Sequence, residues 1–116
     1  MKEINLIIQG IIWFSLAHIL SFYQLNGQFL YKWFRDNEFW VAAAGIFLSY
    51  TYIYGTRDTV AGFEGLLWPA RFVGFGVGMI IYALMVQYYF NESLTPKTII
   101  SLILSVILIS IQALWK

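Results

Sequence analysis

FVGFGVGMIIYALMVQYYF at residues 72–90 and TIISLILSVILISIQALW at residues 98–115 decide the fold class, with the polar NESLTPK between them. Neither apolar run contains an Asp, Glu, Lys or Arg. About 20 apolar residues are enough for a helix to cross a hydrocarbon core of roughly 30 Å. The two runs therefore predict a tight pair of antiparallel transmembrane helices. In the connecting turn, Thr95 is placed to cap the second helix and Pro96 to take its first position.

Two further apolar segments lie earlier in the chain, at about residues 4–23 and 39–55. The third segment begins between Phe63 and Trp68, so its helix is expected over about 66–90. Lipid offers the backbone no hydrogen-bond partners, which makes helices the only open-ended structures able to cross it. We expect an all-α integral membrane protein with one domain over residues 1–116 and four transmembrane helices, the fourth over 98–115.

The composition supports a membrane location and excludes several functions. Hydrophobic residues make up 60% of the 116 residues and charged residues 11%, with a mean hydropathy of +0.71. Soluble domains contain about 25% charged residues. Four spans leave no room for a catalytic domain, and the net charge of +1 indicates no nucleic-acid partner. With no cysteine, one histidine and no enzyme motif, we expect neither an enzyme, nor a cofactor, nor a metal site.

The connection over residues 26–38 mixes charged residues with aromatic ones, including Lys32, Arg35 and Trp33. Such a mixture is typical of a short helix lying on the membrane surface, and a plain loop with interfacial aromatics is the alternative. Tryptophan and tyrosine also gather near the predicted span ends, as in the aromatic belts of membrane proteins.

Orientation in the membrane depends on the distribution of Lys and Arg, which is nearly even between the two predicted sides. Two interpretations stay open. Either both termini are cytoplasmic, or copies insert in both orientations and pair antiparallel. The expected location is the cell membrane, as a multi-pass protein of a bacterial inner membrane or its equivalent.

Ionisable residues at membrane depth are costly and often functional, and His18, Glu64 and Arg71 are the candidates. His18 shares a helix face with Ser15 and Ser21, so it either relays protons or hydrogen-bonds a neighbouring helix. If the third helix begins near Phe63, Glu64 and Arg71 share one face with Trp68 and Tyr82. If Pro69 opens that helix instead, Glu64 lies in the loop and Arg71 extends to the headgroups. On the first alternative, we expect a solute-binding cavity lined by His18, Glu64, Trp68, Arg71 and Tyr82.

Small residues predict close helix packing. Gly74 and Gly78 form a small-xxx-small pair, and Ser101 and Ser105 repeat the spacing in the last helix. Four short helices enclose little space, so we expect a homodimer packed through the last helix or through the glycine face that includes Gly76.

The stretch Gly74-Phe75-Gly76-Val77-Gly78 and the turn from Phe90 to Leu94 resemble the third and fourth helices of small multidrug resistance transporters. More widely, the chain is similar to the drug/metabolite transporter superfamily. The resemblance is ungapped from Gly74 to the end of the sequence, and Gly76-Val77-Gly78 matches the family's Gly-Val-Gly. It implies a four-helix bundle that acts as a dimer and exports or imports small solutes.

The chain departs from the family where the family's chemistry lies. The family carries a glutamate in the middle of helix one, whereas the first span here has no acid beyond Glu3, and Ser15 or His18 falls nearest that position. Arg71 replaces an aromatic residue that lines the family's site. We therefore expect a transporter of a small solute, with an accessory subunit of a larger membrane complex as the alternative. Arg71 favours an anionic or zwitterionic solute over a cation.

Overall fold

The computed structural model describes residues 3–115, and every regular element in that range is helical. Three helices are long and apolar enough to cross a membrane, which is consistent with a multi-pass membrane protein. In chain order the elements are α1 (Ile4–Asn26), a 3-10 turn η1 (Gly27–Phe29), α2 (Lys32–Asp36), α3 (Glu38–Ala43), α4 (Gly45–Gly62), α5 (Leu67–Phe90) and α6 (Pro96–Leu114).

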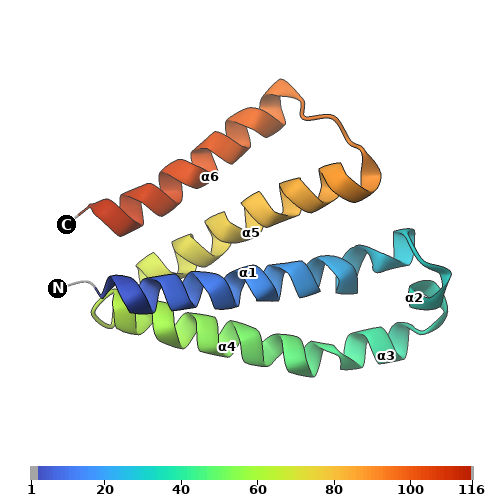
Figure 1. Cartoon of the computed structure of the whole chain (residues 1–116), viewed down its shortest axis with the longest axis horizontal. Coiled ribbons are helices and arrows are strands. Elements are labelled where there is room, and N and C mark those ends of the chain that lie inside the picture. Colours follow the sequence, from blue (N-terminus) through green and yellow to red (C-terminus); the bar gives the residue numbers. More distant parts are fainter. Residues whose placement is uncertain (1–2, 116) are drawn as a thin grey trace.

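Helix α1 is the centre of the bundle (Figure 1). Helix α4 runs antiparallel along α1, α5 packs on another side of α1, and α6 packs extensively on α5 but on no other long helix. The two chain ends lie at the same end of the bundle. This order places α1, α4 and α5 around a common interior and leaves α6 at the periphery.

The α1–α4 contact is close because small residues face each other along it. A Cβ added at Gly10 would overlap the Thr59 hydroxyl, and one added at Gly62 would lie 2.6 Å from Cγ1 of Ile7. The backbone N–H of Glu3 donates to the Gly62 carbonyl at 2.8 Å, which ties the start of α1 to the end of α4. Glycines at these two crossings thus set the separation of the helices.

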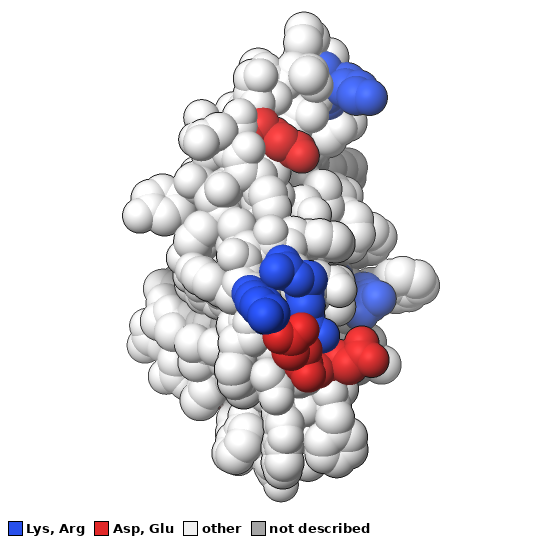
Figure 2. Space-filling view, turned by 90° about the vertical axis from the view of Figure 1, so that its right-hand side faces the viewer, with Lys and Arg blue, Asp and Glu red and all other residues white. Residues whose placement is uncertain are grey.

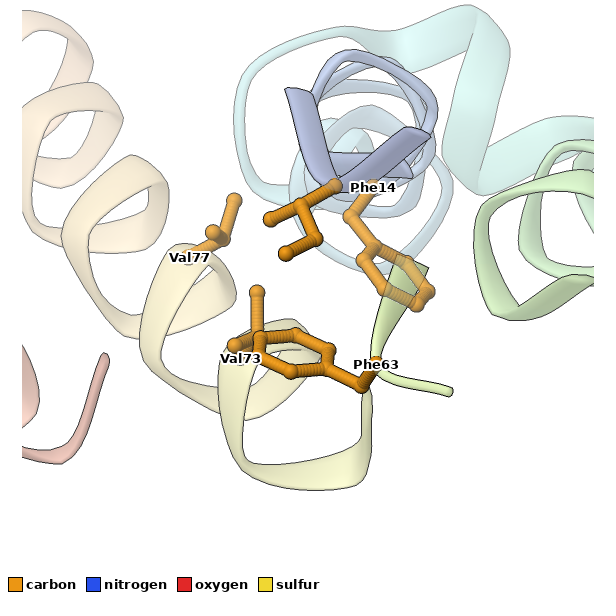
Figure 3. Close-up of a cluster of buried hydrophobic side chains, with 5 residues drawn as sticks. Phe14, Phe63, Val73 and Val77 are labelled. Carbon is orange, nitrogen blue, oxygen red and sulfur yellow. The ribbon is translucent and has the colours of Figure 1, made fainter. Parts of the chain in front are cut away.

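The buried core lies where α1, α5 and the end of α4 meet. Phe14 from α1, Phe63 just after α4, and Val73 and Val77 from α5 point toward one another (Figure 3). Ile7 completes the cluster, and Phe63 and Val73 are almost fully buried. Since the other large apolar side chains are mostly exposed, as expected of surfaces that face lipid, this cluster fixes the arrangement of the three helices.

The second helical segment differs from the prediction at its end. The helix expected over residues 39–55 is divided into α3 and α4, and α4 continues beyond residue 55 to Gly62. Its later turns include the charged residues Arg57 and Asp58. Arg57 is exposed, and its guanidinium carbon lies 5.3 Å from the ring centre of Tyr54. Helix α5 then begins at Leu67, so the connection between the helices is short.

The turn between α5 and α6 confirms the predicted capping. Asn91 adopts a left-handed conformation, φ 52°, at the end of α5, and its N–H donates to the Gln87 carbonyl at 3.2 Å. The Thr95 hydroxyl accepts from the Thr98 N–H at 3.4 Å, and Pro96 is the first residue of α6.

Helices α5 and α6 approach closely only in the half away from their turn. A Cβ at Gly76 would lie 2.6 Å from Cγ1 of Ile109 and 3.1 Å from the Ser105 carbonyl oxygen. Toward the turn the helices diverge (Figure 1), so the tight hairpin predicted from the sequence is only half realised. The glycine face expected to join two copies is covered within the chain at Gly76, because Ser105 and Ile109 already occupy it.

The connection after α1 is partly helical, which favours the first of the two alternatives for this segment. It contains η1 and α2. Phe34 of α2 packs over Gly27, where an added Cβ would lie only 2.4 Å from Cδ2 of the ring. Lys, Arg, Asp and Glu side chains gather on the end of the molecule that carries α2 and the α5–α6 turn (Figure 2). Charged side chains at an end of the bundle, next to long apolar helices, match the distribution expected of a chain that crosses a bilayer.

Candidate functional site

A cavity of about 630 Å³ lies between α1, α4 and α5, and its mostly apolar lining includes the polar side chains of His18, Tyr52, Thr56 and Arg71. Helix α1 forms its floor, while α4 and α5 each pack more extensively on α1 than on each other and leave a space between them. The lining residues come from all three helices: Phe14, His18, Tyr52, Thr56, Leu67, Ala70, Arg71, Gly74 and Phe75.

His18 joins the three helices through hydrogen bonds. Its Nε2 lies 3.0 Å from the Gly74 carbonyl oxygen on α5, and its Nδ1 lies 3.3 Å from the Tyr52 hydroxyl on α4. The Tyr52 hydroxyl in turn lies 2.8 Å from the Ser21 hydroxyl on α1. The rings of His18 and Tyr52 meet edge to face, with centroids 5.4 Å apart. Ser21, Tyr52, His18 and the Gly74 carbonyl thus form one continuous chain, called here the His18 chain.

The partners of His18 determine where its proton lies. A carbonyl oxygen only accepts, so Nε2 carries a hydrogen and donates to Gly74. In the neutral imidazole Nδ1 is then an acceptor, and the Tyr52 hydroxyl donates to it. When His18 is protonated, Nδ1 becomes a donor and the Tyr52 hydroxyl must turn to accept. Because Ser21 can donate or accept, the chain can reverse its direction without moving its heavy atoms.

Two glycines let the imidazole reach the α5 backbone. A Cβ at Gly78 would lie 2.5 Å from Cε1 of His18 and 2.7 Å from Nε2, too close for either to stay in place. A Cβ at Gly74 would lie 3.3 Å from the ring of Phe14, the residue one turn before His18. The small-xxx-small pair recognised in the sequence thus faces His18 and Phe14 of α1, and at Gly78 the imidazole leaves no room for a side chain.

Arg71 lines the same cavity from the second turn of α5. Its side chain is exposed, and it makes no ion pair or hydrogen bond with another side chain in residues 3–115. Neither Asp nor Glu is among the lining residues. The cavity therefore carries one formal positive charge, with a neutral hydrogen-bonding group, His18, farther along α1.

The other three predicted cavity residues lie elsewhere. Glu64 is in the turn before α5 with φ 61°, so the early start of this helix that would have put it on the Arg71 face does not occur. Trp68 is 72% exposed and stacks on Phe72. Tyr82 packs on Phe22 and lines a groove between α5 and α6. Eleven residues of helix separate Arg71 from Tyr82, about 16 Å, which is why one face does not serve one cavity.

Sequence reasoning missed the contribution of α4. Tyr52 and Thr56 line the cavity one helical turn apart, and Tyr52 is the residue that connects His18 to Ser21. Their i, i+4 spacing was a signal, because two polar side chains so spaced share one face of a helix. Which face of α4 turns toward α1 depends on Thr59 and Gly62, whose contacts are with Gly10 and Ile7 of α1, about 50 residues away in the sequence.

Within residues 3–115, no group of three His, Cys, Asp or Glu side chains is arranged to hold a metal ion. Comparisons with protein-family models, with curated proteins and with solved structures found no match to this chain. The transporter resemblance therefore stays a prediction carried by the residues quoted above.

Proposed function

We propose that this protein is a small-solute membrane transporter of the drug/metabolite transporter type, which acts as a dimer and binds its solute in the His18–Arg71 cavity. One observation carries the proposal. A space of about 630 Å³ between three helices contains an Arg that has no carboxylate partner within residues 3–115, and a His in a hydrogen-bonded chain. An accessory subunit that serves only to hold a partner needs no such interior, and a solid apolar core would be the simpler structure.

The proposal includes a fourth membrane crossing by α4. This helix has 18 residues, about 27 Å of rise, and it packs along α1, one of the helices able to span a bilayer. Helices packed side by side along their length lie at the same depth. The charged residues of α4, Arg57 and Asp58, are close to its C-terminal end, where headgroups and water are within reach.

Local charge favours an anionic or zwitterionic solute. Arg71 presents five N–H donors in a planar fork, which suits a carboxylate or a phosphate. The desolvation cost of an arginine in a membrane protein falls when an anion is bound beside it. Phe14 and Phe75 line the same space and supply apolar contact for the remainder of a small molecule.

A second copy is proposed to close the cavity. The space between α4 and α5 is open on the side of exposed Thr56, Arg71 and Phe75, so one chain does not enclose a solute. Since Gly76 is covered within the chain, the outer surface of α6 outside its groove with α5, with exposed Ile100 and Leu104, is the part of that helix left for a partner copy.

The test is uptake into liposomes containing the purified protein, with small carboxylates, phosphates, amino acids and organic cations as solutes. Arg71→Gln should abolish uptake of the anionic or zwitterionic solute, and Arg71→Lys should restore part of it. Arg57→Gln is the matched control, because it removes the same charge from the exposed face of α4 outside the cavity.

The outcomes separate the two candidate functions. If no solute is taken up by the wild type, or if Arg71→Gln and His18→Ala both match it for every transported solute, the cavity is not a transport site. The accessory-subunit alternative then gains, and co-purification of a defined membrane complex would support it.

A further inference from the structure

We propose that the groove between α5 and α6, near their turn, is a specific binding site for a phospholipid whose headgroup carries both a phosphate and a primary ammonium, as in phosphatidylethanolamine. The proposal concerns a part of the molecule that the His18–Arg71 cavity does not reach, and it stands whether or not the protein transports a solute.

The groove exists because α5 and α6 cross at Gly76 and diverge toward the turn. On one side it is a space of about 350 Å³ whose lower part is apolar, with Met79, Ala83 and Val86 from α5. Its mouth is polar and is formed by residues of the turn and of the first turns of α6: Glu92, Ser93, Lys97, Thr98 and Ser101.

On the other side of the same divergence lies a second space of about 370 Å³ with almost no polar surface. Its walls include Ile80 and Leu84 of α5 and Ile103 of α6. Ala83, Leu94 and Leu102 line both spaces, so the two are neighbours across one gap between the helices. A polar mouth above continuous apolar walls matches the shape of a lipid, with a headgroup above and an acyl chain below.

The charges at the mouth identify the headgroup. Glu92 and Lys97 line the same space, are both exposed, and form no ion pair with each other or with another residue of the described chain. A phosphate placed near Lys97 also meets the positive end of the α6 dipole. The remaining charge, Glu92, is matched by an ammonium that donates hydrogen bonds.

The kind of amine matters for this pairing. A primary ammonium has three N–H donors and can bind the Glu92 carboxylate directly, whereas a quaternary ammonium has none. A headgroup with no amine leaves Glu92 unpaired beside a phosphate and repels it. The geometry therefore ranks a phosphoethanolamine headgroup above phosphocholine, and phosphocholine above an anionic phosphoglycerol.

The polar mouth of the groove lies at an end of the molecule. Charged side chains are found on this end (Figure 2), which also carries α2. Thr98 and Ser101 lie in the first turns of α6, and the apolar walls continue from there toward the middle of the helices. The polar–apolar boundary of the groove thus coincides with the expected membrane surface.

The test is native mass spectrometry of the delipidated full-length protein in detergent, titrated with phosphatidylethanolamine, phosphatidylcholine and phosphatidylglycerol of identical acyl chains. The wild type should bind the ethanolamine lipid about two- to fivefold more tightly than the choline lipid, the range expected of one exposed ion pair. Glu92→Gln should remove that preference. Glu38→Gln is the matched control, since it makes the same change near the same end of the bundle but outside the groove.

Two further variants test the position of the lipid. Lys97→Gln should weaken binding of all three lipids, and Ala83→Phe, which fills the wall shared by both spaces, should do the same without lowering the melting temperature of the lipid-free protein. Equal wild-type affinity for the three lipids, or an ethanolamine preference that survives Glu92→Gln, overturns the proposal. So does a disulfide-linked dimer formed by Leu102→Cys in lipid bilayers, because a second copy would then occupy the groove; the chain has no other cysteine to form one.

Discussion

Gly78→Ala tests whether the absence of a side chain at this position is required for His18 to contact the α5 backbone. The new methyl carbon would lie 2.5 Å from Cε1 and 2.7 Å from Nε2 of the imidazole, well inside contact distance. The α5 backbone is held by its own helix, whereas the His18 ring borders the open cavity. We therefore expect the ring to swing away from α5 rather than the helix to move.

The magnitude follows from what the ring loses. His18 gives up its hydrogen bonds to the Gly74 carbonyl and to the Tyr52 hydroxyl, each contributing about 0.5–1.5 kcal/mol. Alanine in the middle of α5 regains about 1 kcal/mol of helix propensity over glycine. The free energy of unfolding should therefore fall by only about 0–2 kcal/mol. Gly45→Ala is the control, because its methyl would meet only the flexible end of Gln24, at 3.1 Å.

The decisive assay is NMR of the imidazole, made simple by the single histidine of the chain. In protein labelled with ¹⁵N-histidine at alkaline pH, the wild type should show a neutral ring protonated at Nε2 with an unprotonated Nδ1. Gly78→Ala should give a mixture of the two tautomers with averaged shifts, as for a ring in water. Gly45→Ala should keep the wild-type spectrum.

Two results would refute this reasoning. The first is a Gly78→Ala spectrum with the same single tautomer. It would mean that the His18 ring does not contact α5 at Gly78. A wild type protonated at Nδ1 would mean that the Gly74 carbonyl is not its partner, and the His18 chain would be wrong as described.

Four other perturbations test the packing and the site. Gly10→Ala should lower the free energy of unfolding by about 1–3 kcal/mol through overpacking against the Thr59 hydroxyl. In a double-mutant cycle, Thr59→Ala in the same protein should recover much of that loss. Independent, additive losses would contradict the close approach of Gly10 to Thr59. Thr59→Ala alone should be neutral or stabilising in thermal unfolding, because that hydroxyl is buried with no hydrogen-bond partner in the described chain. Thr95→Ala should cost about 1 kcal/mol through loss of the α6 cap, seen as a lower melting temperature, and Thr95→Ser should not. Tyr52→Phe should shift the Nδ1 resonance of the histidine toward that of a free imidazole nitrogen; an unchanged resonance would show that the 3.3 Å contact is not a hydrogen bond.

The fold class follows from local features of the sequence, which do not depend on how the helices pack. Apolar runs as long as residues 72–90 and 98–115 demand a membrane and helices, because the backbone finds no other hydrogen-bond partners there. The Thr95–Pro96 start of α6 is equally local, since a cap involves only neighbouring residues. The end of α4 was harder to predict, because Arg57 and Asp58 read as a connection although a helix tolerates them on an exposed face.

The site depends on how the helices face one another, which no single segment specifies. His18 and Arg71 share a cavity because α1 lies between α4 and α5, and that arrangement rests on contacts between distant residues such as Gly10 with Thr59 and Phe14 with Gly74. A helical repeat tells which residues share a face, but the rotation of each face toward its neighbours is decided by which small residues let two backbones approach. The sequence by itself thus determined that His18 and Arg71 are unusual in such a chain. The tertiary structure alone decided that Tyr52 lines the same cavity as these two residues and that Glu64, Trp68 and Tyr82 do not.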